Sequence, residues 1–198
     1  ASVPPAIGPA LSAEFPEVAA YTRLGFSSRV MVQYKEKLFR IRGFVEADSS
    51  IFKVLSFKFV KGNTTALQQP SAVVLTQSLA RQIFGDEDPI NKVITSPDHS
   101  DRMLTVTAVV EDFPSNSHLV INAIHSIGSL MDTDWKSWEV TWDGSVNLYV
   151  RLAPHSEPDR LSEMALPVLR KNLVKTEDGS ERNFRIYLQP ISSIYLGD

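Results

Sequence analysis

The stretch SAVVLTQSLARQIFG, residues 71–85, contains the local pattern that decides the fold. Residues 72–75 are a short, fully apolar run, which favours a buried strand. Thr76 is suited to the N-cap of a helix, and Gly85 to the left-handed position that ends one. Between them the apolar side chains recur on one helical face: Leu79, Ala80, Ile83 and Phe84. The stretch therefore predicts a buried strand followed directly by an amphipathic helix.

A β-hairpin is predicted on each side of this strand–helix unit. Upstream, alternating apolar residues lead into the polar turn 35–37 and continue beyond it, so one face of that hairpin is buried. Its apolar positions are Val30, Val32, Tyr34, Phe39, Ile41 and Val45. Downstream, residues 93–94 and the alternating segment 104–110 flank a polar loop at 96–102.

The remaining segments mix helices and strands. Residues 147–152 and 184–188 are predicted strands, and a helix is expected to begin near Ser156 and to kink at Pro167. The segment 119–131 fits either a strand or a helix. Interleaved helices, strands and hairpins predict an α+β fold with mixed or antiparallel sheets.

Composition excludes several classes of function. The 198 residues carry a formal net charge of -3, which gives no electrostatic basis for binding nucleic acid. There is no cysteine, so disulfides, thiolate metal sites and a cysteine nucleophile are excluded. No run approaches the ~18 apolar residues of a membrane span. The sequence begins at Ala1 rather than with Met, which suggests a piece of a longer protein.

Motifs for phosphate loops, dinucleotide binding, nucleophile elbows and zinc helices are absent from the sequence. Two polar groups resemble weak metal sites: the carboxylates at 86–88, and Asp98, His99 and Asp101 at a hairpin tip. Both are more typical of a solvated turn or an exposed loop tip. We therefore expect no metal site, no cofactor site and no catalytic site.

His118 allows two other hypotheses. With Asp112 it fits a hydrolase, although an acid–base pair needs a geometry that sequence does not show. With His125 it is not expected to share a site, because, if 119–125 are extended, seven steps along the strand put the two rings far apart and on opposite faces. We expect His118 to hydrogen-bond the backbone of its own turn.

Three tryptophans, Trp135, Trp138 and Trp142, are close in sequence and are the candidate partner-contact residues. Exposed, such a row stacks on sugar rings or anchors an interface; buried, it belongs to a core or to packing between lobes. If the row is exposed, the alternative function is a secreted carbohydrate- or peptide-binding module.

Taken together, the motifs resemble those of the MacB-like periplasmic core domain of MacB/FtsX-type ABC transporter permeases. The resemblance is carried by SAVVLT at 71–76 with Ala80, IFG at 83–85, DPI at 88–90 with Lys92, LTVTAVV at 104–110 and DFPSNSH at 112–118. Further matches are FPEV at 15–18 with Thr22 and Arg23, and the ending from 188 to 196.

The sequence departs from the family's pattern at three positions. Asn91 replaces a usual Gly and is expected to keep the left-handed turn, which Asn tolerates well. Ala108 replaces a strand Gly, which predicts no very close backbone approach there. Tyr195 replaces a usual His, which puts a polar role for that position in doubt.

The resemblance implies a two-lobed domain. A porter-like βαβ lobe would comprise residues 1–61 plus 118–198, and a smaller mixed α/β lobe, residues 62–117, would be inserted in it. The domain would lie on the periplasmic face of the bacterial inner membrane, between two membrane helices of a permease. It would couple ATP-driven motion of those helices to substrate or partner handling, with no catalysis of its own. The implied partners are an ATPase subunit or domain, a second permease copy or homologue, and a periplasmic adaptor or lipoprotein.

Overall fold

The computed structural model describes residues 3–27, 30–97, 102–114, 116–127, 146–172 and 187–194. Its helices are α1 (Ile7–Glu14), α2 (Ile51–Val54), α3 (Gln77–Phe84), α5 (Pro158–Asn172) and a 3-10 turn, η3 (Ile191–Ser193). Its strands are β1 (Val18–Ser27), β2 (Val30–Tyr34), β3 (Lys37–Ile41), β4 (Phe44–Ala47), β5 (Phe59–Lys61), β6 (Ala72–Thr76), β7 (Val93–Ser96), β8 (Arg102–Val110), β9 (Ala123–Ser126) and β10 (Asn147–Leu152). In these ranges, none of the helices has both the length and the apolar character that a membrane crossing requires.

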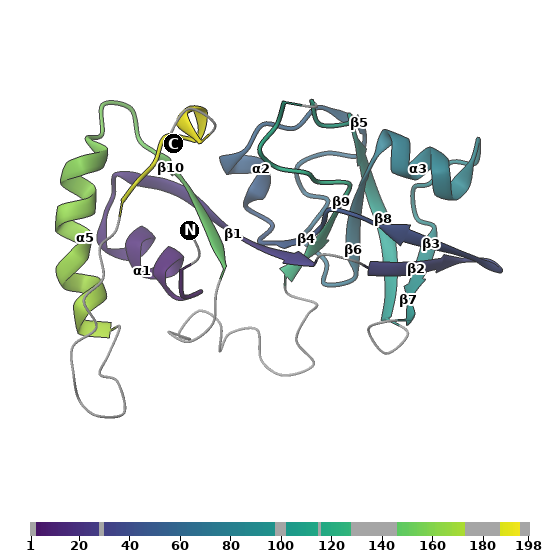
Figure 1. Cartoon of the computed structure of the whole chain (residues 1–198), viewed down its shortest axis with the longest axis horizontal. Coiled ribbons are helices and arrows are strands. Elements are labelled where there is room, and N and C mark those ends of the chain that lie inside the picture. Colours follow the sequence, from purple (N-terminus) through teal and green to yellow (C-terminus); the bar gives the residue numbers. More distant parts are fainter. Residues whose placement is uncertain are drawn as a thin grey trace.

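One sheet of ten strands runs through the part of the chain that is described, in the order β10-β1-β4-β9-β6-β8-β7-β2-β3, with β5 paired to β8. The sheet is mixed, because β4 pairs with β9 and β6 with β8 in parallel, whereas the other pairs are antiparallel. Figure 1 shows α1 and α5 at one end of this sheet and α3 at the other. The domain is therefore a mixed α/β fold.

The predicted strand–helix unit and both hairpins are confirmed. β6 is buried throughout, and α3 follows it directly. β2 and β3 form the upstream hairpin around Lys35, and β7 and β8 form the downstream one. The prediction is wrong for Val45, which lies on the separate strand β4 and packs in a different hydrophobic cluster from Val30, Val32 and Ile41. The ambiguous segment 119–131 contains strand β9. Pro167 lies inside α5 as predicted, whereas most of the predicted strand at 184–188 lies outside the described residues.

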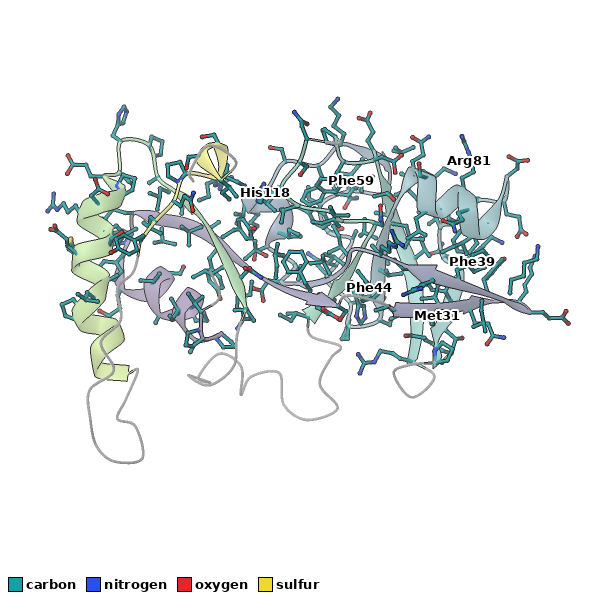
Figure 2. The ribbon with its side chains drawn as sticks, viewed as in Figure 1. Met31, Phe39, Phe44, Phe59, Arg81 and His118 are labelled. Carbon is teal, nitrogen blue, oxygen red and sulfur yellow. The ribbon has the colours of Figure 1, made fainter. Side chains whose placement is uncertain are left out.

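The sheet packs against different elements on its two faces. One hydrophobic cluster joins α3 to strands β2, β3, β4, β6, β7, β8 and β9. Phe44 of β4 belongs to this cluster and Phe39 of β3 packs against it, whereas the Arg81 side chain points from α3 away from the strands (Figure 2). A second cluster packs Ile51 of α2 against the opposite face of the sheet. A third joins α1 and α5 to the β1–β10 end.

The first two clusters each combine residues from 1–61 with residues from 62–117. The third is built from residues near the two ends of the chain. The lobe boundaries at 1–61 plus 118–198 and at 62–117 stay a prediction.

Two departures from the family pattern are explained by backbone geometry. Asn91 has a φ of 63°, so the left-handed turn is retained as predicted. The prediction for Ala108 is wrong, because the chain does approach it closely. A Cβ placed on Gly62, which has a φ of 78°, would lie 2.6 Å from the Ala108 Cβ and 2.7 Å from the Thr107 carbonyl oxygen. The two backbone segments therefore do approach each other closely here, and the glycine that permits the contact is Gly62 rather than residue 108. Tyr195 lies outside the described residues.

Candidate functional site

Asp112 caps helix α3 from a distant loop. One carboxylate oxygen accepts the backbone N–H of Ser78 at 3.2 Å, and the other accepts the Ser78 hydroxyl at 2.8 Å. Thr76 occupies the N-cap position as predicted, but its hydroxyl is buried and makes no hydrogen bond among the described residues. Asp112 thus supplies a hydrogen bond that an N-cap side chain usually accepts.

His118 is held by β10. Its Nε2 lies 3.3 Å from the Tyr149 hydroxyl, and the two rings are 6.0 Å apart. Burial raises the pKa of Tyr149 above its usual value of 10, so the hydroxyl stays protonated at neutral pH. This contact with β10 was not anticipated from the sequence. Asp112 thus contacts Ser78 and His118 contacts Tyr149, and the hydrolase hypothesis for these two residues stays a prediction.

His125 lies in a different environment from His118. It is buried on β9, with its ring 5.8 Å from that of Phe44, and it is in register with Glu46 on β4. The two histidines are therefore placed in different surroundings by the sheet, in line with the prediction that they do not form one site.

The acidic turn after α3 forms exposed ion pairs. Glu87 contacts Lys35 at 2.8 Å and Lys92 at 2.7 Å, and it accepts the Tyr34 hydroxyl at 3.1 Å. Hydrogen bonds from Lys35, Lys92 and Tyr34 lower the pKa of Glu87 from 4.5 to about 2. Asp88 pairs with Lys61 at 2.9 Å. These contacts connect the turn after α3 to the tip of the β2–β3 hairpin.

Within the described ranges, no three His, Asp or Glu side chains gather in a way that would hold a metal ion. The other candidates from the sequence, Asp98, His99, Asp101 and the Trp135, Trp138 and Trp142 row, lie outside the described residues. Their roles, and the alternative of a carbohydrate- or peptide-binding module, stay predictions.

A buried ion pair that the sequence did not reveal links β1 to the end of β4. The Arg23 guanidinium binds both carboxylate oxygens of Asp48, at 2.9 Å through Nε and at 2.7 Å through Nη2. Arg23 is 3% exposed. The pair lies in the wall of a hollow of about 490 Å³, which is also lined by Lys53 and Gln68.

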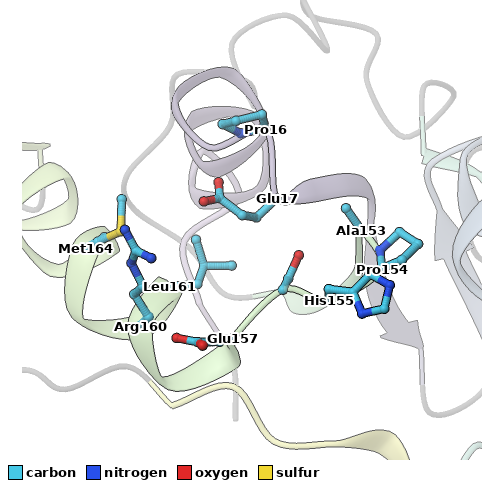
Figure 3. Close-up of a pocket in the computed structure, with 10 residues that line it drawn as sticks. Pro16, Glu17, Ala153, Pro154, His155, Glu157, Arg160, Leu161 and Met164 are labelled. Carbon is cyan, nitrogen blue, oxygen red and sulfur yellow. The ribbon is translucent and has the colours of Figure 1, made fainter.

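A second hollow, of about 410 Å³, lies between the start of β1 and the start of α5 (Figure 3). Its lining is contributed by Pro16 and Glu17, by the turn 153–157, and by Arg160, Leu161 and Met164 of α5. The turn includes His155 with a φ of 65°. Residues 16–17 and 153–164 are far apart in sequence and meet only because β1 pairs with β10. No motif identified this hollow in advance.

Solved structures share this fold. A domain of a putative permease protein from Porphyromonas gingivalis is 23% identical, with a TM-score of 0.74 over 96% of this chain and 83% of that chain. The periplasmic region of MacB from Actinobacillus actinomycetemcomitans is 18% identical, with a TM-score of 0.62 over 83% of this chain and 72% of that chain. The extracellular domain of the noncanonic ABC-type transporter YknZ from Gram-positive bacteria is 15% identical, with a TM-score of 0.62 over 86% of this chain and 84% of that chain. The comparison with curated proteins finds no match.

The fold is thus shared with periplasmic and extracellular domains of membrane transporters. The sequence identifies the family more specifically than the fold does, since the family model of the MacB-like periplasmic core domain matches residues 2–166. The chain belongs to the MacB-like periplasmic core domain family and is the extracytoplasmic, non-catalytic domain of a MacB/FtsX-type ABC transporter permease. The resemblance inferred from the motifs at 71–92 and 104–118 is confirmed.

Proposed function

We propose that this domain couples ATP-driven motion of membrane helices to the handling of a substrate or partner outside the bacterial inner membrane. The observation that supports the proposal best is where the ends of the described chain lie. Val3 and Leu188 pack against the same hydrophobic cluster, formed by α1, β1 and α5. Figure 1 shows the first and last described segments, α1 and η3, in this half of the molecule. A body attached at one end moves with the helices that hold it.

The continuous sheet supports a rigid response. Backbone hydrogen bonds connect β10, next to the attached end, to β3 at the opposite edge. A closely packed core transmits displacement rather than absorbing it. We propose that the partners are an ATPase subunit or domain, a second permease copy or homologue, and a periplasmic adaptor or lipoprotein. The two lobes, 1–61 plus 118–198 and 62–117, would then move as one body.

Spin labels on the full-length permease with its ATPase test this proposal. The absence of cysteine makes Leu38→Cys and Glu163→Cys unique labelling sites within this domain. Leu38 is exposed on β3, and Glu163 is exposed on α5. We expect the distance between labels on two permease copies to change when ATP is trapped, while the Leu38–Glu163 distance within one copy stays constant. Unchanged distances between copies would refute coupled motion.

A further inference from the structure

Strand β3 forms a free edge of the sheet in the part of the chain that is described. It pairs with β2 along its whole length, from Lys37 opposite Tyr34 to Ile41 opposite Val30, and it is the last strand in the order of the sheet. The side of β3 that faces away from β2 therefore presents backbone N–H and C=O groups to solvent. Such an edge can accept an extended segment of another protein as one more strand.

The side chains along this edge follow the order cation, apolar, apolar, cation: Lys37, Leu38, Phe39 and Arg40. Lys37 and Arg40 are exposed, and within the described ranges neither of them forms an ion pair. Leu38 is 59% exposed. Phe39 is half-buried and packs against the cluster beneath α3. Both charges and part of the apolar surface of the edge are thus available to an added strand.

The alternation of side chains in β3 decides which of them share a face. Phe39 faces α3, and so does Lys37, which lies opposite Tyr34 of the same cluster. Leu38 and Arg40 point to the other face of the sheet. Each face of the edge therefore carries one cation next to one apolar side chain.

This order specifies the segment that fits. Residues directly opposite each other on neighbouring strands interact, and opposite charges or two apolar side chains stabilise the pair. A carboxylate therefore suits the positions beside Lys37 and Arg40, and an apolar side chain suits those beside Leu38 and Phe39. The order of the four residues is the same in both directions. The complementary order, acidic, apolar, apolar, acidic, thus fits β3 whether the added strand is parallel or antiparallel.

The charges of β3 disfavour a second copy of this chain as the occupant. Antiparallel pairing of two β3 strands in the complementary register places Lys37 of one opposite Arg40 of the other, and like charges in that position are destabilising. Nearby carboxylates do not compensate for these two cations: Glu87 is held by two other lysines, and Glu36 forms no ion pair among the described residues. Cations on an edge prevent self-pairing in this way, but they attract an acidic strand.

The position of β3 leaves it accessible to a partner. Eight strand-to-strand steps separate it from β10, or roughly 40 Å along the sheet at about 4.8 Å per step. Figure 1 shows β3 at the end of the molecule opposite α1 and α5. The edge is therefore far from the end at which we propose that the domain is attached.

We propose that the free edge of β3 binds an extended acidic segment of a partner protein. Two carboxylates of the segment pair with Lys37 and Arg40, the two apolar side chains between them lie on Leu38 and Phe39, and its backbone extends the sheet. The inference rests on the proposed function for the existence of a partner, and it adds the conformation and the chemistry of the segment that is bound.

Titration of the isotope-labelled chain with the peptide acetyl-Thr-Glu-Val-Val-Glu-Thr-amide tests the proposal, with the backbone amide resonances of residues 37–41 as the reporter. We expect saturable shifts confined to β3 and its neighbours. Methylation of both valine nitrogens should weaken binding by about tenfold or more, because adjacent N–H groups of a strand point to opposite sides and one of the two must face β3.

Reversal of the two charges tests the pairing. Lys37→Glu/Arg40→Glu should weaken binding of the acidic peptide by about tenfold or more, since two attractive pairs become repulsive. The same variant should bind acetyl-Thr-Lys-Val-Val-Lys-Thr-amide, which the parent chain does not bind. Lys58→Glu/Arg81→Glu is the matched control, because both side chains are exposed and lie outside β3, while the change in net charge is the same.

Several results would overturn the proposal: absence of shifts in β3, equal binding of the methylated peptide, or failure of the charge-reversed variant to bind the lysine peptide. If the β3 resonances shift on raising the concentration of the chain alone, the occupant is a second copy. If phosphatidylglycerol vesicles bind through Lys37 and Arg40 while the peptide does not, the surface is a membrane contact. These titrations need neither membrane nor ATPase, and the spin-label test needs no strand on β3, so either can fail without the other.

Discussion

The buried pair of Arg23 and Asp48 gives the most quantitative prediction about this fold. Asp48 accepts three hydrogen bonds from Arg23: from the backbone N–H at 2.7 Å, from Nε at 2.9 Å and from Nη2 at 2.7 Å. The side chains are 3% and 14% exposed. Asp48→Ala removes the carboxylate that accepts all three hydrogen bonds and that balances the charge of the buried guanidinium in this pair.

Breaking a buried pair in this way costs about 3–5 kcal/mol of unfolding free energy. In a domain of this size each kcal/mol lowers the melting temperature by about 2–4 °C, so a fall of roughly 10 °C is expected. Urea denaturation and calorimetry of the isolated chain measure both quantities. The double variant Arg23→Met/Asp48→Ala should be more stable than Asp48→Ala alone, because it no longer buries a guanidinium that has lost the Asp48 carboxylate.

Glu111→Ala provides the matched control. Glu111 pairs with Lys58 at 3.4 Å, but these side chains are 55% and 81% exposed, and an exposed pair contributes little. No measurable change in stability is expected there. The reasoning is refuted if Asp48→Ala costs less than about 1 kcal/mol, or if the double variant loses the sum of the two single losses.

The other predictions concern the cap, the ion pairs and the close approach. Asp112→Ala removes the cap of α3 and should lower the unfolding free energy by about 1 kcal/mol in urea denaturation; an unchanged midpoint would contradict the capping role. Because the pKa of Glu87 is lowered from 4.5 to about 2, its contribution to stability is present above pH 4.5 and is lost as the pH falls toward 2. Glu87→Gln should remove that part of the acid dependence in denaturation curves recorded across this range, and a curve identical to that of the parent chain would count against it. Gly62→Ala should destabilise more than Gly85→Ala, since both have a positive φ but only Gly62 has backbone within 3 Å of the added Cβ. Equal thermal midpoints for the two variants would show that the contact with Ala108 is not tight.

The capping of α3 shows where sequence reasoning stops. The apolar stripe at Leu79 and Ile83 predicts the helix, because four-residue spacing places these side chains on one face. Thr76 predicts the start of the helix correctly. The cap itself comes from Asp112, 34 residues from Ser78 in sequence, and no local pattern reveals it.

Strand β9 is a second example. The sequence of 119–131 fits a helix or a strand because apolar residues occupy most of it. The segment 123–126 becomes a strand because it lies between two others, parallel to β4 and antiparallel to β6. Buried on both sides, it gains hydrogen bonds that an isolated segment cannot make.

The sequence by itself determined the strand–helix unit, the two hairpins and the family, because these depend on the spacing of residues that are neighbours in the chain. Only the tertiary structure decided that Arg23 meets Asp48, that Gly62 lies against Ala108, and that Glu17 faces α5. Such pairs form when the sheet brings distant segments together, and their energy depends on burial and on donor–acceptor geometry. Neither quantity is defined until the chain has folded.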